Sequence, residues 1–254
     1  MNQALEGITV LDFAQGMAGS IATMMMSDFG ADVIKVEPPG GDQYRAFPQS
    51  LLWNRGKKSI VLDVNDKEDI NELRKLSLKA DVVIEGFEPG FADSHGFGYE
   101  TLKTDHSGLV YCSITAFGPK GPYAKYKSYE GLVQAKSGRL MTFAGLTGRE
   151  GPNFASVKVA NHSAGMAAVR GIISALMVRD RTGLGQRVET SLLQAMTYYD
   201  MHQFLLWQMM IKYPETFDFD PTTVAKRPSP IQYLPVRTKD GKWMQLANLI
   251  ERLF

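Results

Sequence analysis

The sequence predicts an α/β protein whose large domain is built on a doubly wound, mainly parallel sheet of the Rossmann-like type. Three observations predict this class. Short runs rich in β-branched residues alternate with helical patterns in the first half of the chain, glycines and prolines separate them, and the second half is mainly helical. The sheet is expected to be parallel because a helix between consecutive strands returns the chain to the starting edge.

The first half of the chain contains the expected sheet. Ile8–Phe13 is a compact apolar run of strand length that ends at the glycine-containing turn Gly16–Gly19. Ser20–Phe29 is then expected to form a helix, and Asp66–Leu78 has the apolar spacing of an amphipathic helix. Four further strands are expected at Asp32–Glu37, Ser59–Val64, Asp81–Glu85 and Gly108–Ile114.

The second half is expected to be helical and to end in a second, smaller domain. Helices are expected at Tyr129–Leu140, from Asn161 or Ser163 to Arg181, and at Leu192–Met210, with a short strand at Gln186–Thr190. Residues 1–212 would form the large domain, and the proline-containing stretch 213–230 a linker. Two β runs within Tyr233–Leu246 predict a hairpin that opens a smaller domain at 231–254. That domain would be truncated, so the sequence is interpreted as an incomplete copy.

Composition and charge exclude several classes of function. A formal net charge of +1 gives no electrostatic reason to expect nucleic acid or an anionic membrane as partner. No apolar stretch is long enough to span a bilayer, and no secretory signal is evident, so a cytoplasmic location is expected. The four histidines lack metal-ligand spacing, so no metal site is expected. The single cysteine, Cys112, is expected to be a buried, inert thiol.

Two segments could contact a phosphate. In Gly16–Gly19, glycines before a helix would let backbone N–H groups approach an anion, although a plain tight turn fits the same residues. Arg55, Lys57 and Lys58 lie on a loop that enters a strand, where they would either dock a nucleotide phosphate or form a solvated charged surface. The residues by themselves leave both alternatives open.

A series of collinear sequence blocks resembles the family III CoA-transferases, a group that includes formyl-CoA transferase, the carnitine CoA-transferases and the α-methylacyl-CoA racemases. The resemblance extends over Leu5–Gln194 and is specific because many blocks occur in the family's order. The blocks are Leu5–Phe13 followed by Ala18-Gly19, then Gly30–Asp42, Lys57–Asp63, Asp81–Glu85, Phe117–Pro122, Gln134–Gly138 and Arg181–Gln186.

The resemblance implies a large domain that binds CoA and, for the complete fold, two chains interlocked as a dimer. It implies CoA or an acyl-CoA as substrate, a carboxylic acid as second substrate, and no permanently bound cofactor. In this family an aspartate attacks the acyl-CoA and passes through anhydride and thioester intermediates. The CoA contacts implied for this chain are Met17, Ala18, Lys57, Lys58, Leu62, Phe87 and Lys127.

The chain departs from the family pattern at the nucleophile and at three implied cofactor contacts. Asn161 occupies the position of the catalytic aspartate, and a neutral amide is a very poor nucleophile. Gly86 replaces an asparagine, Ser94 an arginine, and Asn65 a common lysine. Tyr129 stands where the racemase branch has its catalytic histidine, which disfavours racemase activity. Four departures together indicate a lineage released from catalysis rather than a single engineered substitution.

Two hypotheses of function follow. In the first, the chain is a non-nucleophilic subunit that pairs with an active paralogue, so that the hetero-oligomer is the CoA-transferase. In the second, the chain, as a homodimer, is an active transferase or isomerase that uses another group, for which Glu130 and His162 are the nearest candidates. A CoA-binding scaffold without transfer activity remains a third alternative.

Overall fold

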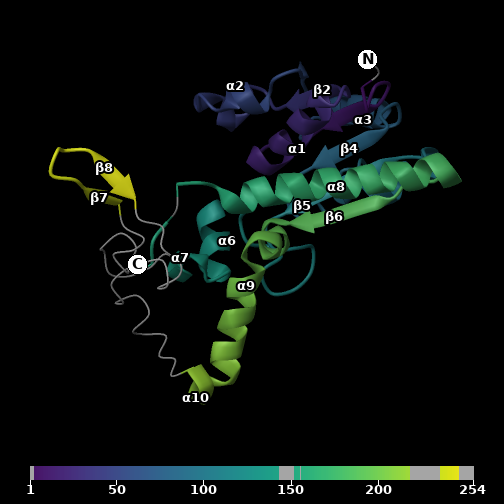
Figure 1. Ribbon diagram of the computed structural model, residues 1–254. Helices are drawn as coiled ribbons and strands as arrows, with labels where there is room; N and C mark the ends of the chain where they lie inside the picture. Colours follow the sequence, from purple (N-terminus) through teal and green to yellow (C-terminus); the bar gives the residue numbers. More distant parts are fainter. Residues whose placement is uncertain (1–2, 143–151, 155, 218–234, 246–254) are drawn as a thin grey trace. The chain divides into compact units, whose positions relative to one another are not determined.

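The computed structural model describes residues 3–142, 152–154, 156–217 and 235–245. Its centre is a six-stranded parallel sheet in the order β3-β2-β1-β4-β5-β6 (Figure 1). The strands are β1 (Thr9–Asp12), β2 (Asp32–Glu37), β3 (Lys58–Val61), β4 (Val82–Glu85), β5 (Val110–Thr115) and β6 (Arg187–Ser191). The predicted α/β class and parallel sheet are therefore confirmed.

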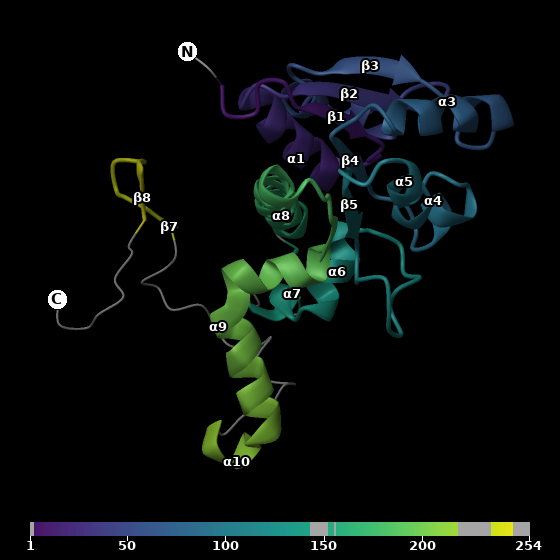
Figure 2. The ribbon, with the colours of Figure 1, turned by 90° about the vertical axis from the view of Figure 1, so that its right-hand side faces the viewer.

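Helices cover both faces of this sheet (Figure 2). Helices α1 (Met17–Asp28) and α8 (Val159–Thr182) lie on one face, and α3 (Lys67–Ser77), α4 (Phe91–Ser94) and α5 (Tyr99–Asp105) lie on the other. The remaining helical segments of the described chain are a 3₁₀ turn at Gln43–Ala46, α2 (Ser50–Trp53), α6 (Glu130–Lys136), α7 (Arg139–Thr142), α9 (Leu192–Lys212) and α10 (Pro214–Phe217).

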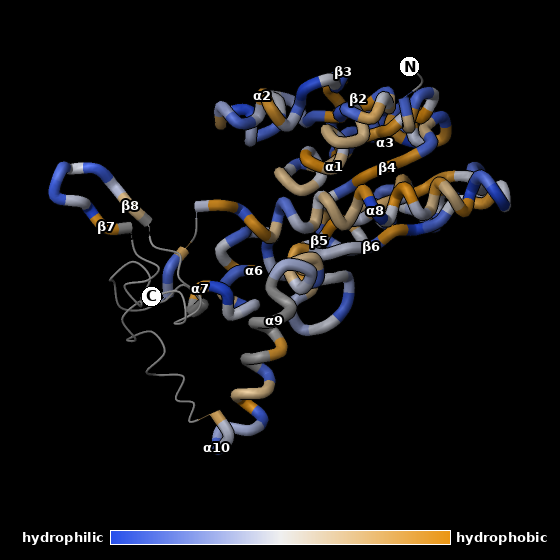
Figure 3. Tube along the Cα trace, viewed as in Figure 1, coloured by the Kyte–Doolittle hydropathy of each residue, from blue (hydrophilic) through white to orange (hydrophobic). Residues whose placement is uncertain are grey.

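The two-sided arrangement follows from alternation along the central strands. Val10 and Cys112 point to the core shared with α1 and α8, whereas their neighbours Leu11 and Tyr111 point to the core on the other face. Successive side chains of a strand face opposite sides, so a strand buried on both faces is a continuous apolar run. Figure 3 shows this for β4, which is coloured as hydrophobic and whose four residues are all buried.

Several helices differ from their expected limits. Helix α1 begins at Met17, three residues before the expected start at Ser20, and α9 ends at Lys212, two residues after the expected end. The helix expected at Tyr129–Leu140 is divided into α6 and α7, because Gly138 adopts a positive φ of 77° that ends the first segment. Helix α8 begins at Val159, ahead of the expected start at Asn161 or Ser163. Asn161 therefore lies inside the first turn and does not serve as the N-cap residue.

The contacts divide the chain into two compact units. The first comprises Met1–Val133 and Lys158–Tyr199, and the second comprises Gln134–Val157 and Asp200–Phe254. In the second unit, β7 (Pro235–Arg237) and β8 (Trp243–Gln245) form the predicted antiparallel hairpin. The domain limits expected from sequence, at 212 and 230, stay a prediction, and most of the expected linker lies outside the described residues.

Candidate active site

The first unit contains a cavity of about 310 Å³ beside the carboxyl ends of β1 and β4. These two strands are neighbours at the point where the order of the sheet reverses, which is where open α/β sheets bind their ligands. The cavity is lined by Ala14–Gly19, Gln43, Tyr44, Gly86–Pro89, Ile114–Ala116, Ala124, Tyr126–Tyr129, Asn161 and Leu192.

The loop after β1 provides one wall of the cavity and leads into the N-terminus of α1. The first N–H groups of a helix have no partner within the helix, so this end attracts anions. Gly19 is required for the tight path of the loop, because a Cβ at this position would lie 2.1 Å from Cβ of Ala14. A glycine therefore allows the helix end to stay close to the strand that precedes it.

Helix α8 brings Asn161 to the cavity because Gly165 lets it pack closely against α1. A Cβ on Gly165 would lie 2.8 Å from the carbonyl oxygen of Ala18 and 3.0 Å from Ile21. Asn161 precedes Gly165 by four residues and so lies on the same helix face, one turn closer to the N-terminus. In the sequence Asn-x-x-x-Gly, the glycine thus allows the two helices to pack closely, and this packing places Asn161 at the cavity.

Glu130 caps this helix from a distance in sequence. Its buried carboxylate accepts hydrogen bonds from the backbone N–H groups of Ala160 (2.8 Å) and Asn161 (3.0 Å). The side-chain amide of Asn161 donates a third hydrogen bond, 2.6 Å long, to Oε2 of Glu130. A carboxylate at a helix N-terminus satisfies donors that lack helical partners, and Lys158 at the N-cap has no side-chain acceptor to do so. This tertiary cap is why α8 begins before the residues that the sequence favoured.

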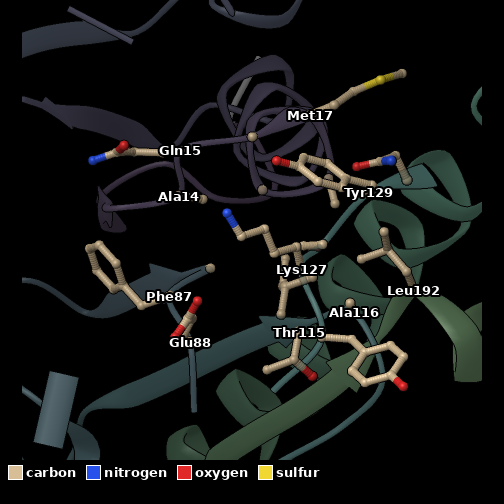
Figure 4. Close-up of a pocket in the computed structure, with 18 of the residues that line it drawn as sticks. Ala14, Gln15, Met17, Phe87, Glu88, Thr115, Ala116, Lys127, Tyr129 and Leu192 are labelled. Atoms are coloured by element: carbon tan, nitrogen blue, oxygen red, sulfur yellow. The ribbon is translucent and has the colours of Figure 1, made fainter. Parts of the chain in front are cut away.

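Lys127 supplies the positive charge of the cavity. Among the described residues that line it, Lys127 is the one cation and Glu88 the one carboxylate. Figure 4 shows Lys127 at the centre of the labelled residues, with its side-chain nitrogen directed toward the loop that holds Ala14. Together with the N-terminus of α1, this cation makes the cavity suited to an anionic ligand.

A buried carboxyl group, that of Glu85, lies at the end of β4 beside a second cavity. Glu85 lines the second cavity, of about 270 Å³, which shares Glu88, Pro89 and Thr115 with the first. Burial raises the pKa of Glu85 to about 6, although the N–H of Phe87, which donates to its Oε2 at 2.7 Å, acts in the opposite direction. Glu85 is therefore poised to titrate close to neutral pH.

Comparison with known proteins identifies the family. A sequence model described as CoA-transferase family III matches residues 5–254. The chain belongs to this family. Similar proteins include an acetyl-CoA:oxalate CoA-transferase from Acetobacter aceti, 35% identical over 218 residues, which cover 82% of this chain and 56% of that protein. A succinate–glutarate CoA-transferase from Agrobacterium fabrum is 40% identical over 207 residues, covering 74% of this chain and 51% of that protein.

Solved structures agree with this membership. A CAIB/BAIF family protein from Brucella suis superposes with a TM-score of 0.77 at 34% identity, covering 95% of this chain and 65% of that one. The protein Rv3272 from Mycobacterium tuberculosis superposes with a TM-score of 0.75 at 29% identity, covering 81% and 58%. The family III chain described here spans about half the length of the curated relatives that it matches.

The structure brings together five of the eight site residues expected from the family III resemblance. Met17, Ala18, Phe87, Lys127 and Asn161 all line the first cavity. The other three are not among the described residues that line it. Leu62 is buried in the core on the α3 face, Lys58 forms an exposed 2.8 Å ion pair with Asp32, and Lys57 is buried against Asp12.

The three residues that the resemblance marks as departures at cofactor contacts are spread over the first unit. Gly86 lines the first cavity, and a Cβ there would meet Ile114 and Ala14 only at 3.7–4.0 Å. Ser94 donates to the carbonyl of Phe91, and Asn65 donates to Asp63, and both side chains are exposed. Gly86 is thus the one of the three that lies at the cavity.

Sequence reasoning missed several cavity residues. Gln15, Gln43, Tyr44 and Tyr126 line the cavity together with the residues that were expected. The available signal was positional, because Gln15 follows β1, and Gln43 and Tyr44 follow the glycine turn after β2, at the sheet edge where ligands bind. In the described part of the chain, no cluster of His, Cys, Asp or Glu could hold a metal ion. No described helix combines the length and apolarity needed to cross a bilayer.

Proposed function

We propose that this chain takes part in CoA transfer between an acyl-CoA and a carboxylic acid, as the non-nucleophilic subunit of a pair whose other member carries the aspartate. The observation that carries the proposal is Asn161, which lines the family III cavity with a neutral amide bonded to Glu130. An amide offers no carboxylate oxygen to form an acyl anhydride. The chain would retain CoA through the α1 N-terminus and Lys127.

The alternative, an enzyme active by itself, is less well supported by the geometry. Glu130 is buried and its two oxygens accept three hydrogen bonds from α8, so attack by this carboxylate would uncap the helix. His162 is exposed, contacts the carbonyl of Lys158, and is not among the described residues that line the cavity. Glu88 remains as the carboxylate at the cavity wall.

The named relatives suggest the class of acid. Their names include oxalate, succinate and glutarate, all short dicarboxylic acids. We therefore propose a short dicarboxylic acid as the acceptor and its CoA thioester, or another short acyl-CoA, as donor. The remaining expectations belong to the same proposal: a large domain at 1–212, a linker at 213–230, a small domain opening at 231–254, an interlocked dimer and a cytoplasmic location.

A covalent-adduct assay tests the proposal. The 254-residue chain and its Asn161→Asp variant are incubated with ¹⁴C-labelled acyl-CoA, and the intact mass and bound label are measured. We expect label on the wild type that is removed by gel filtration, and full transfer only when an aspartate-bearing paralogue is added. An adduct on wild-type Glu88, Glu130 or His162 would establish the alternative. Light scattering of the chain with and without the paralogue measures the oligomer.

A further inference from the structure

Two buried lysines bond to the loop after β1 and to the first turn of α1. Lys35 Nζ donates to the carbonyl oxygen of Ala14 at 3.1 Å and to the hydroxyl of Ser20 at 3.2 Å. Lys57 Nζ donates to the carbonyl oxygen of Ser20 at 3.0 Å. Ala14 and Ser20 flank Gln15–Gly19, the stretch that lines the cavity. The two ammonium groups therefore bond to both ends of the segment that forms this wall, and neither lysine is among the described residues that line the cavity.

Each lysine has a buried counterion. Lys57 Nζ lies 3.2 Å from Oδ2 of Asp12, and Lys35 Nζ lies 2.8 Å from Asp42. Both lysine side chains are 2% exposed, so solvent does not screen these pairs. Asp12 further accepts the N–H of Ala14 at 3.0 Å and the hydroxyl of Thr23 at 2.6 Å. One carboxylate thus links the end of β1 to the loop and to α1.

In this network, opposite charges offset the effect of burial on one another's pKa. Burial by itself would raise the pKa of Asp12, but the cations Lys57 and Lys35 outweigh it and hold the pKa below the usual value. Burial likewise acts to lower the pKa of Lys35, and Asp12 and Asp42 outweigh it and raise the pKa. For Lys57 burial prevails and its pKa is lowered, with Asp12 opposing the shift. Asp12 is consequently the ionised centre of the group.

This geometry bears on how Lys57 contributes to a CoA site. Asp12 and the carbonyl of Ser20 already occupy the ammonium group, which is almost fully buried. To reach a phosphate, Lys57 would have to leave Asp12 as a buried, unpaired carboxylate, which is strongly destabilising. Its neighbour Lys58 points elsewhere, to Asp32 at the amino ends of β2 and β3, whereas the cavity adjoins the carboxyl ends of the strands.

We infer that Lys57, together with Lys35, is a positioning residue that fixes the segment Ala14–Ser20, the end of the β1–α1 loop and the first turn of α1, in the shape of the cavity wall. The inference rests on the proposed binding of CoA for its functional part. Lys57 supports CoA affinity through the loop and the N-terminus of α1, without touching the cofactor. Lys127, which lies in the cavity, provides the direct electrostatic contact.

Hydrogen exchange and CoA titration together test this inference. The test variant is Asp12→Asn/Lys57→Gln, which removes both charges and leaves no unpaired ion. Backbone amides of Gln15–Ser20 should exchange about tenfold faster or more than in the wild type, while those of β5 stay unchanged. CoA affinity should fall about five- to tenfold, because a loosened wall must be ordered on binding. Lys58→Gln is the matched control and should change neither quantity.

The salt dependence of binding separates positioning from direct contact. We expect Asp12→Asn/Lys57→Gln to weaken CoA binding by the same factor at low and high salt. The CoA affinity of Lys127→Gln, by contrast, should no longer depend on salt. Unchanged loop exchange in the double variant, unchanged CoA affinity, or a loss of salt dependence equal to that of Lys127→Gln would each overturn the inference. If the wild type binds no CoA, the proposed function fails, and loop exchange still decides whether the lysines hold the loop.

Discussion

The side-chain nitrogen of Asn161 lies 2.6 Å from Oε2 of Glu130, and the amide donates a hydrogen bond to this buried carboxylate. The donor is the feature that an aspartate lacks. Residue 161, which the resemblance aligns with the family's nucleophile, therefore carries a donor matched to a neighbouring anion. The same geometry determines what an aspartate at this position would do.

Asn161→Asp is expected to make stability fall with rising pH. It would place two carboxylates in contact, so the pKa of the introduced group rises above its unfolded value of about 4. A raised folded-state pKa means that stability is present below about pH 4 and is lost as pH rises through the folded value. Urea denaturation should show the variant about 1–3 kcal/mol less stable than the wild type at pH 8, with a smaller difference at pH 5. Glu130→Gln in the same background should remove this pH dependence, and its persistence there would contradict the explanation.

Asn161→Asp alone is expected to give transfer rates far below those of family III enzymes. The resemblance implies CoA contacts from an asparagine and an arginine at positions 86 and 94, and Gly86 and Ser94 lack those side chains. A hydrogen bond to a charged phosphate contributes roughly 1.5–3 kcal/mol, so two such bonds correspond to about 10²–10⁴ in CoA affinity. Steady-state transfer assays measure the rate. A rate typical of the family would contradict the expected loss of CoA affinity at Gly86 and Ser94.

Adding Gly86→Asn to that variant should raise kcat/KM by about tenfold or more. A Cβ at Gly86 can be accommodated at the wall of the cavity, because it would meet its neighbours at ordinary contact distances of 3.7–4.0 Å. Gly86→Ala is the matched control, since it adds the Cβ without the amide. Equal gains from both substitutions would show that the backbone, and not the amide, is responsible.

Glu85 is expected to make the wild-type chain more stable in mild acid. Burial raises its pKa to about 6 from an ordinary value of 4.5, so its contribution is present below about pH 4.5 and is lost as pH rises through 6. A shift of this size corresponds to about 2 kcal/mol. Denaturation between pH 4.5 and 8 should show a flatter profile for Glu85→Gln. Glu88→Gln, three residues away and exposed, should keep the wild-type slope.

Gly165→Ala is expected to destabilise the chain by about 1–3 kcal/mol, although alanine is the better helix former. The added Cβ would meet a backbone carbonyl, that of Ala18, at 2.8 Å, and backbone cannot rotate away. Gly171→Ala in the same helix meets a methyl group of Val188 and should cost less. Thermal unfolding of the two variants gives the comparison. A larger loss of stability for Gly171→Ala than for Gly165→Ala would show that the α1–α8 contact is not the tighter of the two.

The elements of the fold were largely predictable because their signals are local. The strand at Asp32–Glu37 was predicted with its observed limits, and the other strands differ by at most three residues, since a β-branched run bounded by turn residues specifies a strand by its period and length. The predicted hairpin at β7 and β8 was confirmed for the same reason. Five of the eight expected site residues meet at the cavity because loops that follow parallel strands gather at one edge of the sheet.

The sequence by itself thus determined the α/β class, the parallel sheet and the family. Only the tertiary structure decided that Glu130 caps α8 and that Lys57 is buried. These contacts join Glu130 to a residue 31 positions away and Lys57 to one 45 positions away. Patterns with the strand period of about 2 or the helix period of about 3.6 residues indicate which face of an element is buried. They do not indicate which distant charged residue packs against that face. A lysine on a polar loop and a lysine in a buried ion pair therefore have the same local sequence, and packing alone distinguishes them.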